Sequence, residues 1–332
     1  MKQILISLAA LAMIFACQKF PEAEVQPAEP ETTIVTFLLE DNGLSRATSD
    51  SNESTIETAQ VAVYDSNGQL LSIGDASDGA AVLRVPLGAT GCSAIALANS
   101  TIDLGITSSW TVAHMQTSTL GENRSLSLTG LEMSGFMGNI TFTENYTGTV
   151  RMGRIAAKVE IDEIVNALPG NDVLQINGIY LINVSKSARC DCVVENVTWA
   201  QKRGYVASET TITPYTADIF NELVYPGDTY DTPHYFYCYP NPTTTDSSAE
   251  TWSPRFTRLV VEATVGTGHY YYPINIKGAT SGLMNNTLYK ITRLTITGPG
   301  SDSPDKPISK GGASFTFQVA DWNSGISQEV EI

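Results

Sequence analysis

Short runs of β-branched, aliphatic and aromatic residues, separated by turn residues, make up most of the chain from residue 33 onward. The first run reads TIVTFLL (33–39) and is followed by the turn sequence DNG (41–43). A second run, QVAVY (60–64), ends at DSNG (65–68), where Asn-Gly accepts the positive φ of a tight hairpin turn. Many short strands with turn residues between them predict a mostly β fold, arranged as an antiparallel sandwich or an open barrel.

Helical patterns are few and short, and we expect helices only at residues 109–116 and 216–223. A boundary near residues 148–154 would divide the chain into two β domains of ordinary size, residues 47–150 and 151–332. The other predicted strands lie at residues 69–73, 80–86, 92–98, 125–129, 150–161, 174–184, 235–239, 258–264, 270–276, 288–297, 314–319 and 328–332.

The N-terminus has the features of a lipoprotein signal. Lys2 precedes an apolar run (4–15) that has the length of a signal-peptide core and is too short to span a bilayer. The sequence IFAC (14–17) matches a lipobox, with a branched residue three positions before the cysteine and a small one next to it, although Phe15 is bulkier than usual. We therefore expect residues 1–16 to be removed and Cys17 to carry lipid; the alternative is a plain signal peptide that contains a cysteine.

Composition and charge narrow the function further. Residues 17–32 are rich in proline and glutamate and predict a disordered tether. The 332-residue chain has a formal net charge of -16, which disfavours binding to nucleic acid or to anionic lipid. No segment after the signal is apolar over eighteen consecutive residues, so no membrane-spanning helix is predicted.

Motifs that would carry catalysis are not found in the sequence. The three histidines, His114, His234 and His269, each stand alone, without a second histidine or a cysteine at ligand spacing. The nucleophile elbow, the phosphate-binding loops and the zinc-protease motif do not occur. We therefore predict no catalytic residue, no metal site and no cofactor.

The cysteines after Cys17 leave one question open. An oxidising compartment would allow a disulfide, but the sequence does not determine which cysteines pair. The CDC sequence (190–192) is too tight for a zinc knuckle or for the usual redox pair. The four cysteines concerned are Cys92, Cys190, Cys192 and Cys238.

Arg46 is the single basic residue between Lys19 and Arg84. It lies just after the first predicted strand, in a polar segment without periodicity, where an arginine-specific protease would find one site; the alternative is an ordinary solvated loop arginine. A cut there would leave residues 33–46 attached to the lipid but no longer to the body. If that strand left, the sheet would expose two rows of backbone groups and an apolar groove that a strand from another molecule could fill.

The C-terminus contains a candidate for that strand. Apolar residues alternate with polar ones before and after a break at DWNSG (321–325). The alternative is that this is the last strand pair of the second domain. The alternating positions are Phe315, Phe317, Val319, Val330 and Ile332.

Taken in order along the chain, these motifs resemble the major fimbrillin (FimA-type) family of type V pili from Bacteroidetes-group bacteria. The resemblance covers essentially the whole chain and is most specific near the end, where a strand, a GPG turn, a Pro-rich loop and a closing strand with Trp follow one another. The matching segments are Cys17, Ser45-Arg46-Ala47, VAVYD (61–65), RMGRIAAKV (151–159), YKI (289–291), LTITGPGSDSP (294–304), PI (307–308) and VADW (319–322).

The resemblance implies two transthyretin-like antiparallel β-sandwich domains and a structural subunit without enzymatic activity. It implies lipidation at Cys17, transport to the outer membrane, and cleavage between Arg46 and Ala47 by an arginine-specific trypsin-like protease. A donor segment from a neighbouring copy, expected within residues 315–332, would then build an extracellular homopolymer that supports adhesion. The strand expected to be displaced contains Ile34, Val35, Phe37 and Leu39.

Other interpretations remain open at this stage. The chain could be a tip or accessory subunit of the same fimbria, or a basal anchor that keeps its lipid and is never cut. A surface glycan-binding lipoprotein is a different class, suggested only by aromatic runs such as YYY (270–272). The sequence does not identify an adhesion target or a filament geometry.

Overall fold

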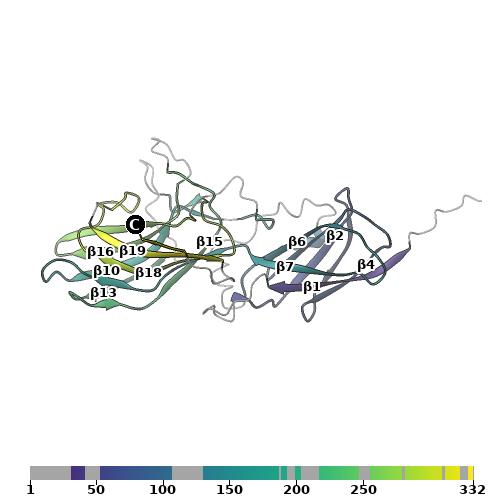
Figure 1. Cartoon of the computed structure of the whole chain (residues 1–332), viewed down its shortest axis with the longest axis horizontal. Coiled ribbons are helices and arrows are strands. Elements are labelled where there is room, and N and C mark those ends of the chain that lie inside the picture. The colour runs from purple at the N-terminus through teal and green to yellow at the C-terminus, as the bar shows by residue number, and fades with distance from the viewer. Residues whose placement is uncertain are drawn as a thin grey trace, which may run out of the picture. The chain divides into compact units, whose positions relative to one another are not determined.

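A computed structural model gives the fold of the chain. It describes residues 31–41, 53–106, 130–186, 188–192, 199–202, 217–246, 255–278, 281–308, 311–321 and 328–331. Within them, the one helical element is a 3₁₀ turn, η2 (Leu104–Ile106), and all other regular structure is β. The described residues contain no helix long and apolar enough to cross a membrane. The prediction of a mostly β protein is therefore confirmed (Figure 1).

Seven strands form the first sheet, in the order β3-β2-β5-β6-β7-β1-β4. The first strand in sequence, β1, is one of the inner strands, between β4 and β7 (Figure 1). It runs antiparallel to β4 and parallel to β7. The strands are β1 (Thr32–Asp41), β2 (Ala59–Tyr64), β3 (Leu70–Asp75), β4 (Ala80–Pro86), β5 (Cys92–Ala98), β6 (Met133–Ile140) and β7 (Thr147–Arg154).

The two ends of this sheet order enclose a common apolar core. β6 and β7 pair at only two positions, Met133↔Arg154 and Ser134↔Gly153, so the two halves of the sheet are joined by a short stretch of pairing. Side chains from both halves meet in one buried cluster that includes Val35 and Phe37 of β1 and Val61 of β2. Alternate residues of a strand point to opposite faces, so half of each strand contributes to this core.

The remaining strands form three sheets. One is four-stranded, in the order β13-β10-β16-β17, and one is a short β11-β12 pair. The largest has the order β14-β9-β18-β19-β20, with β8 between β15 and β18. Their bounds are β8 (Ala157–Ile161), β9 (Ile164–Asn166), β10 (Leu174–Ile182), β11 (Val184–Ser185), β12 (Trp199–Ala200), β13 (Ala217–Val224), β14 (Thr229–Tyr230), β15 (His234–Cys238), β16 (Arg258–Val265), β17 (Gly268–Asn275), β18 (Thr287–Ile296), β19 (Ala313–Asp321) and β20 (Gln328–Glu331).

The predicted helix at residues 216–223 is wrong, because residues 217–224 form strand β13. β13 pairs antiparallel with β10, with a bulge at Ile176/Gly178. A side-chain carbon at Gly178 would approach Ile219 to 2.9 Å, so the glycine leaves room for this partner strand. Pairing with a strand some forty residues away outweighs the weak local helix preference. The other predicted helix, 109–116, lies outside the described residues.

Three further details differ from the expected pattern. The single strand expected at 150–161 is two strands, β7 and β8, because the chain leaves the first sheet after Arg154 and enters another at Ala157. Strand β6 was not predicted, since Gly135 and Gly138 interrupt its apolar residues. The sheets are not purely antiparallel: β1 is parallel to β7, and β18 is parallel to β8 and β9.

A buried polar cluster joins the segment before β2 to strand β8. The Glu53 carboxylate is fully buried and accepts hydrogen bonds from Lys158 Nζ and from the Tyr237 hydroxyl, both at 2.7 Å. The Arg154 side chain, also fully buried, donates to the Glu53 carbonyl at 2.9 Å. Buried charges persist in proteins when they are paired in this way.

Candidate functional site

The candidate site is the position that β1 occupies between β4 and β7. The register with β4 runs from Thr32↔Pro86 to Leu38↔Ala80, and that with β7 from Thr36↔Thr147 to Asp41↔Met152. Backbone groups of β1 are therefore paired on both sides over much of its length. A strand in this position is hydrogen-bonded to both neighbours. Its removal would leave unpaired backbone groups on β4 and on β7.

The inward face of β1 fills an apolar site. Val35 and Phe37 are fully buried, and Leu39 is nearly so. The Phe37 ring lies 6.4 Å from that of Phe142 and 6.1 Å from that of Tyr146, and the last two meet edge to face at 5.4 Å. Burying each of these three β1 side chains stabilises the sheet by roughly 1.5–3 kcal/mol. Any replacement strand needs apolar side chains at the same alternate positions.

Two neighbours shape the centre of this site. Gly148 of β7 pairs with Phe37, and a side chain there would collide with Tyr146, whose hydroxyl would be 2.8 Å away. The Tyr146 carbonyl in turn accepts a hydrogen bond from the Thr36 N–H at 2.9 Å. Burial raises the pKa of the Tyr146 hydroxyl, which favours its neutral form. The glycine thus gives the aromatic cluster the space to hold the Phe37 ring.

The outward face of the same strand is partly apolar. Ile34 is 50% exposed and Leu38 38% exposed, and Val82 of β4, beside them, is 64% exposed. Of the four residues expected in the displaced strand, Val35, Phe37 and Leu39 therefore point inward and Ile34 points outward. Alternation along a strand explains this division.

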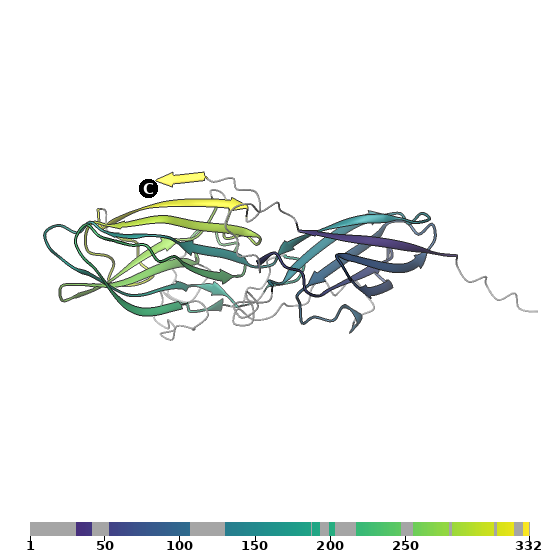
Figure 2. The same ribbon diagram turned by 90° about the horizontal axis from the view of Figure 1, so that it is seen from below.

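The C-terminal residues expected to donate a strand fall in two different places. Phe315, Phe317 and Val319 belong to β19, an inner strand with partners on both sides, β18 and β20. Val330 belongs to β20, which pairs only with β19 over four positions, at the edge of its sheet (Figure 2). Ile332 lies outside the described residues. Removal of β20 would therefore break one strand pairing, that with β19, whereas removal of β19 would break two.

The other predicted processing sites cannot be compared with the structure. The signal peptide, Cys17, most of the tether and the pair Arg46–Ala47 lie outside the described residues. On either side of Arg46, the described chain ends β1 at Asp41 and resumes at the fully buried Glu53.

The cysteines show no disulfide among Cys92, Cys190, Cys192 and Cys238. Cys190 and Cys238 are buried, and burial raises the pKa of the Cys238 thiol to about 12. Burial likewise raises the thiol pKa of Cys92 and Cys192. Protonated thiols are poor nucleophiles and poor metal ligands.

The two described histidines have ordinary partners. His234 Nδ1 lies 2.8 Å from Asp218, and its ring stacks on Phe220 at 5.1 Å. His269 Nε2 lies 2.9 Å from Glu262. The second ring nitrogen of His234, Nε2, lies 2.8 Å from the Tyr230 hydroxyl, and burial raises the pKa of that hydroxyl, which keeps it neutral. The described residues contain no group of three or more His, Cys, Asp or Glu side chains suited to a metal. His114 lies outside the described residues.

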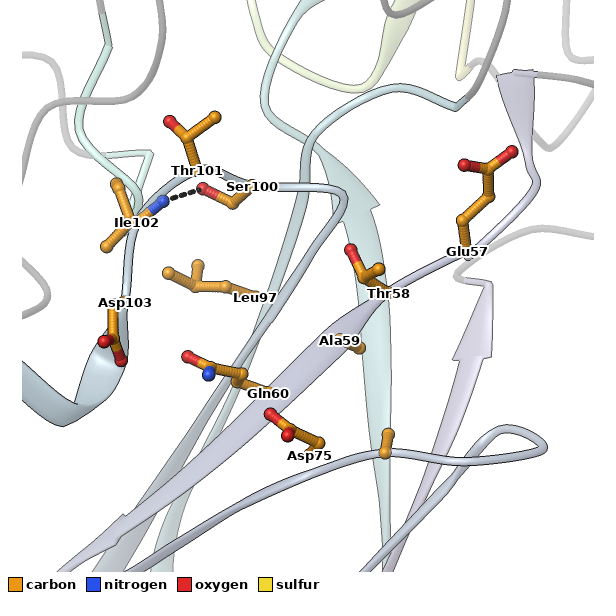
Figure 3. Close-up of a pocket in the computed structure, with 11 residues that line it drawn as sticks. Glu57, Thr58, Ala59, Gln60, Asp75, Leu97, Ser100, Thr101, Ile102 and Asp103 are labelled. Carbon is orange, nitrogen blue, oxygen red and sulfur yellow. Dashed lines mark hydrogen bonds between the residues drawn. The ribbon is translucent and has the colours of Figure 1, made fainter.

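A separate pocket of about 550 Å³ opens beside β2 and the 3₁₀ turn (Figure 3). Its polar groups already serve the local backbone. The Gln60 side-chain oxygen accepts from the Leu104 N–H at 3.0 Å, and Asp103 accepts from the Gly105 N–H at 2.8 Å. Ser100 accepts from the Ile102 N–H at 3.1 Å, as Figure 3 shows. These contacts fix the turn and do not assemble a reactive centre.

Comparison with known proteins identifies the fold. No family model matches the sequence, and no curated protein matches it at a significant level. Among solved structures, a fimbrilin (FimA) from Porphyromonas gingivalis has a TM-score of 0.65 at 18% identity, over 88% of this chain and 98% of that one. A candidate cell adhesion protein from Bacteroides eggerthii has a TM-score of 0.63 at 19% identity, over 88% of this chain and 97% of that one.

A third structure with the same fold is a C-terminally truncated tip fimbrial protein from P. gingivalis. Its TM-score is 0.55 at 14% identity, over 88% of this chain and all of that one. A fimbrilin and a tip fimbrial protein thus share this fold, so the fold by itself does not distinguish a tip protein from another fimbrial subunit. The predicted resemblance to the fimbrillin-type proteins of Bacteroidetes is confirmed at the level of the fold, over 88% of the chain.

Proposed function

We propose that this chain is a structural subunit of a cell-surface fimbria that polymerises by donor-strand exchange. The observation that carries the proposal is the position of β1, an inner strand with an apolar inward face that lies next to the lipid-tether segment in sequence. A leader strand in this position can keep the subunit closed until it is removed. The fold shared with a fimbrilin and a tip fimbrial protein agrees with this role.

The proposed maturation follows the order of the chain. Cys17 receives lipid and holds the precursor at the outer membrane; a trypsin-like protease then cuts after Arg46. Residues 17–46, which carry β1, leave the body. The groove between β4 and β7 then accepts the C-terminal segment of another copy, and repetition builds the extracellular filament.

Replacing Arg46 with alanine tests the cut. We expect lipidated monomers to accumulate at the outer membrane and filaments to be lost, because β1 stays covalently attached. Membrane fractionation, with N-terminal sequencing of the wild-type protein from cells, provides the measurement. A mature wild-type chain that starts at Ala47 supports a polymerising subunit, and one blocked at Cys17 supports a basal anchor.

Arg293→Ala is the matched control for this experiment. Arg293 is an exposed arginine of β18, with a side chain paired to Glu163 at 2.8 Å, and lies far from Arg46 in sequence. Its removal should leave maturation and filaments unchanged. Normal filaments from the Arg46 variant would contradict the proposed cleavage.

Deleting residues 326–332 tests the donor assignment. We expect the precursor to remain folded, because β20 is an edge strand with four register pairs, and polymer to be strongly reduced, because the groove loses its occupant. Thermal unfolding measures the first quantity, and sedimentation after cleavage measures the second. Unchanged polymer from the deletion variant would remove the C-terminal segment as the donor.

The tip or accessory role is the second candidate, because a tip fimbrial protein has the same fold. Immunogold labelling of filaments distinguishes the two: a shaft subunit is labelled along the whole length and a tip subunit at one end only.

A further inference from the structure

Two arginines stand on the outer face of the strands that border β1. Arg84 of β4 pairs with Ile34, near the start of β1, and Arg151 of β7 pairs with Glu40, near its end. Both arginines are exposed. Arg84 donates a hydrogen bond to the Thr32 hydroxyl at 3.1 Å, and neither arginine forms an ion pair within the described part of the chain. The proposed groove is therefore bordered by a positive charge on each wall, at opposite ends.

The C-terminal segment has the complementary charge pattern. Its last residues read QEVEI (328–332), so two glutamates flank Val330. In an extended strand, residues next to one another point to opposite faces. A strand that buries Val330 therefore presents Glu329 and Glu331 together on its outer face.

The position of Phe37 is the central apolar site of the groove. If Val330 occupies it, Glu329 and Glu331 take the outer positions that Thr36 and Leu38 hold in β1. This is true whichever way the donor strand runs, because the two glutamates are symmetric about Val330. The C-terminal residue Ile332 then takes the Val35 or the Leu39 position.

Those two outer positions are the diagonal neighbours of the two arginines. Thr36 lies two residues from Ile34, the partner of Arg84, and Leu38 lies two residues from Glu40, the partner of Arg151. Diagonal neighbours in a sheet are about 7–8 Å apart, which long side chains such as Arg and Glu can span.

We propose that Arg84 and Arg151 bind Glu329 and Glu331 of a second copy of this chain and thereby set the register of the donor strand. The inference rests on the proposed donor-strand function and names the partner contacts within it. A slip by one residue would turn both glutamates into the apolar groove, and a slip by two would move one of them away from its arginine.

The same comparison separates the leader strand from the donor. At the two positions concerned, β1 carries Thr36 and Leu38, which have no charge, and its one carboxylate on this face, Glu40, lies opposite Arg151 and not near Arg84. The donor would therefore add a carboxylate beside Arg84, where β1 has none. Exposed pairs contribute little stability each, but complementary charges raise association rates and select register. Salt should weaken the effect, since both arginines are exposed.

The experiment uses the unlipidated precursor, residues 17–332 with Cys17→Ser, cut by an arginine-specific protease while polymer growth is followed by light scattering. Arg84→Glu with Arg151→Glu reverses the groove charges, and Glu329→Lys with Glu331→Lys reverses the donor charges. We expect each reversal to slow growth about tenfold at low salt, and the two together to restore it to within about threefold of wild type.

Three controls make the result specific. Arg293→Glu with Lys306→Glu changes the net charge equally at two exposed positions away from the groove and should leave the rate unchanged. Arg84→Lys with Arg151→Lys keeps the charge and should also keep the rate. Thermal unfolding checks each precursor, and Arg84→Gln with Arg151→Gln serves as a milder second test, with a slowing of about threefold.

The outcomes separate this inference from the proposed function. If the cut wild-type chain forms no polymer, the proposed function is overturned and this inference with it. If it polymerises and the reversals do not change the rate, or the combined variant is as slow as the slower parent, only this inference is overturned. Single reversals then give the strand direction: Arg84→Glu is rescued by Glu329→Lys if the donor runs as β1 does, and by Glu331→Lys if it runs the other way.

Discussion

Replacing Phe37 with alanine should lower the free energy of unfolding of the precursor by about 3–5 kcal/mol. Phe37 is fully buried and its ring contacts Phe142 and Tyr146, so the change removes a large side chain and leaves a cavity in the aromatic cluster. Denaturant unfolding of the unlipidated precursor, followed by circular dichroism, measures the loss.

Ile34→Ala is the matched control, because Ile34 lies in the same strand but its side chain is half exposed. Its cost should stay below about 1 kcal/mol, as for other surface substitutions. Equal losses from the two variants would contradict the assignment of inward and outward faces. In the cut protein, Phe37→Ala should also raise the rate at which residues 17–46 dissociate, because β1 then buries less apolar surface against the body.

The sequence was sufficient to predict β1 and its approximate ends, because turn residues follow a run of β-branched and aromatic side chains. It could not show that β1 lies inside a sheet, since that depends on β7, which is more than a hundred residues away. Parallel pairing leaves no local signature such as a two-residue hairpin turn. The groove, which is the basis of the proposed function, was therefore inferred from Arg46 and from the resemblance.

The predicted donor segment is a second case in which the sequence pattern does not reveal the neighbours of a strand. Alternation made Phe315, Phe317 and Val330 look equivalent, yet the first two lie in an inner strand and the last in an edge strand. Periodicity records which side chains share a face and does not record how many neighbours a strand has. Burial of Glu53 could not be predicted either, because its partners Lys158 and Tyr237 are distant in sequence.

The second large effect on stability is expected at the buried ion pair of Glu53 and Lys158. Lys158→Met should lower the free energy of unfolding by about 3–5 kcal/mol, because it removes the ammonium group that lies 2.7 Å from the fully buried Glu53 carboxylate. The Tyr237 hydroxyl would still donate to it, but a neutral donor does not replace the ammonium. Glu53→Ala should cost less, because Lys158 keeps a second carboxylate, Glu160, at 3.7 Å.

Combining Lys158→Met with Glu53→Leu should recover most of the lost stability, since the double variant removes the buried carboxylate together with its ammonium partner. The cycle of single and double variants, measured by denaturant unfolding, gives the coupling between the two residues. Glu53 lies seven residues after Arg46, so this pair would fasten the new N-terminal segment to β8 once β1 has been released. We therefore expect the cut Lys158→Met protein to lose more thermal stability than the cut double variant; equal losses would show that the ion pair does not hold that segment.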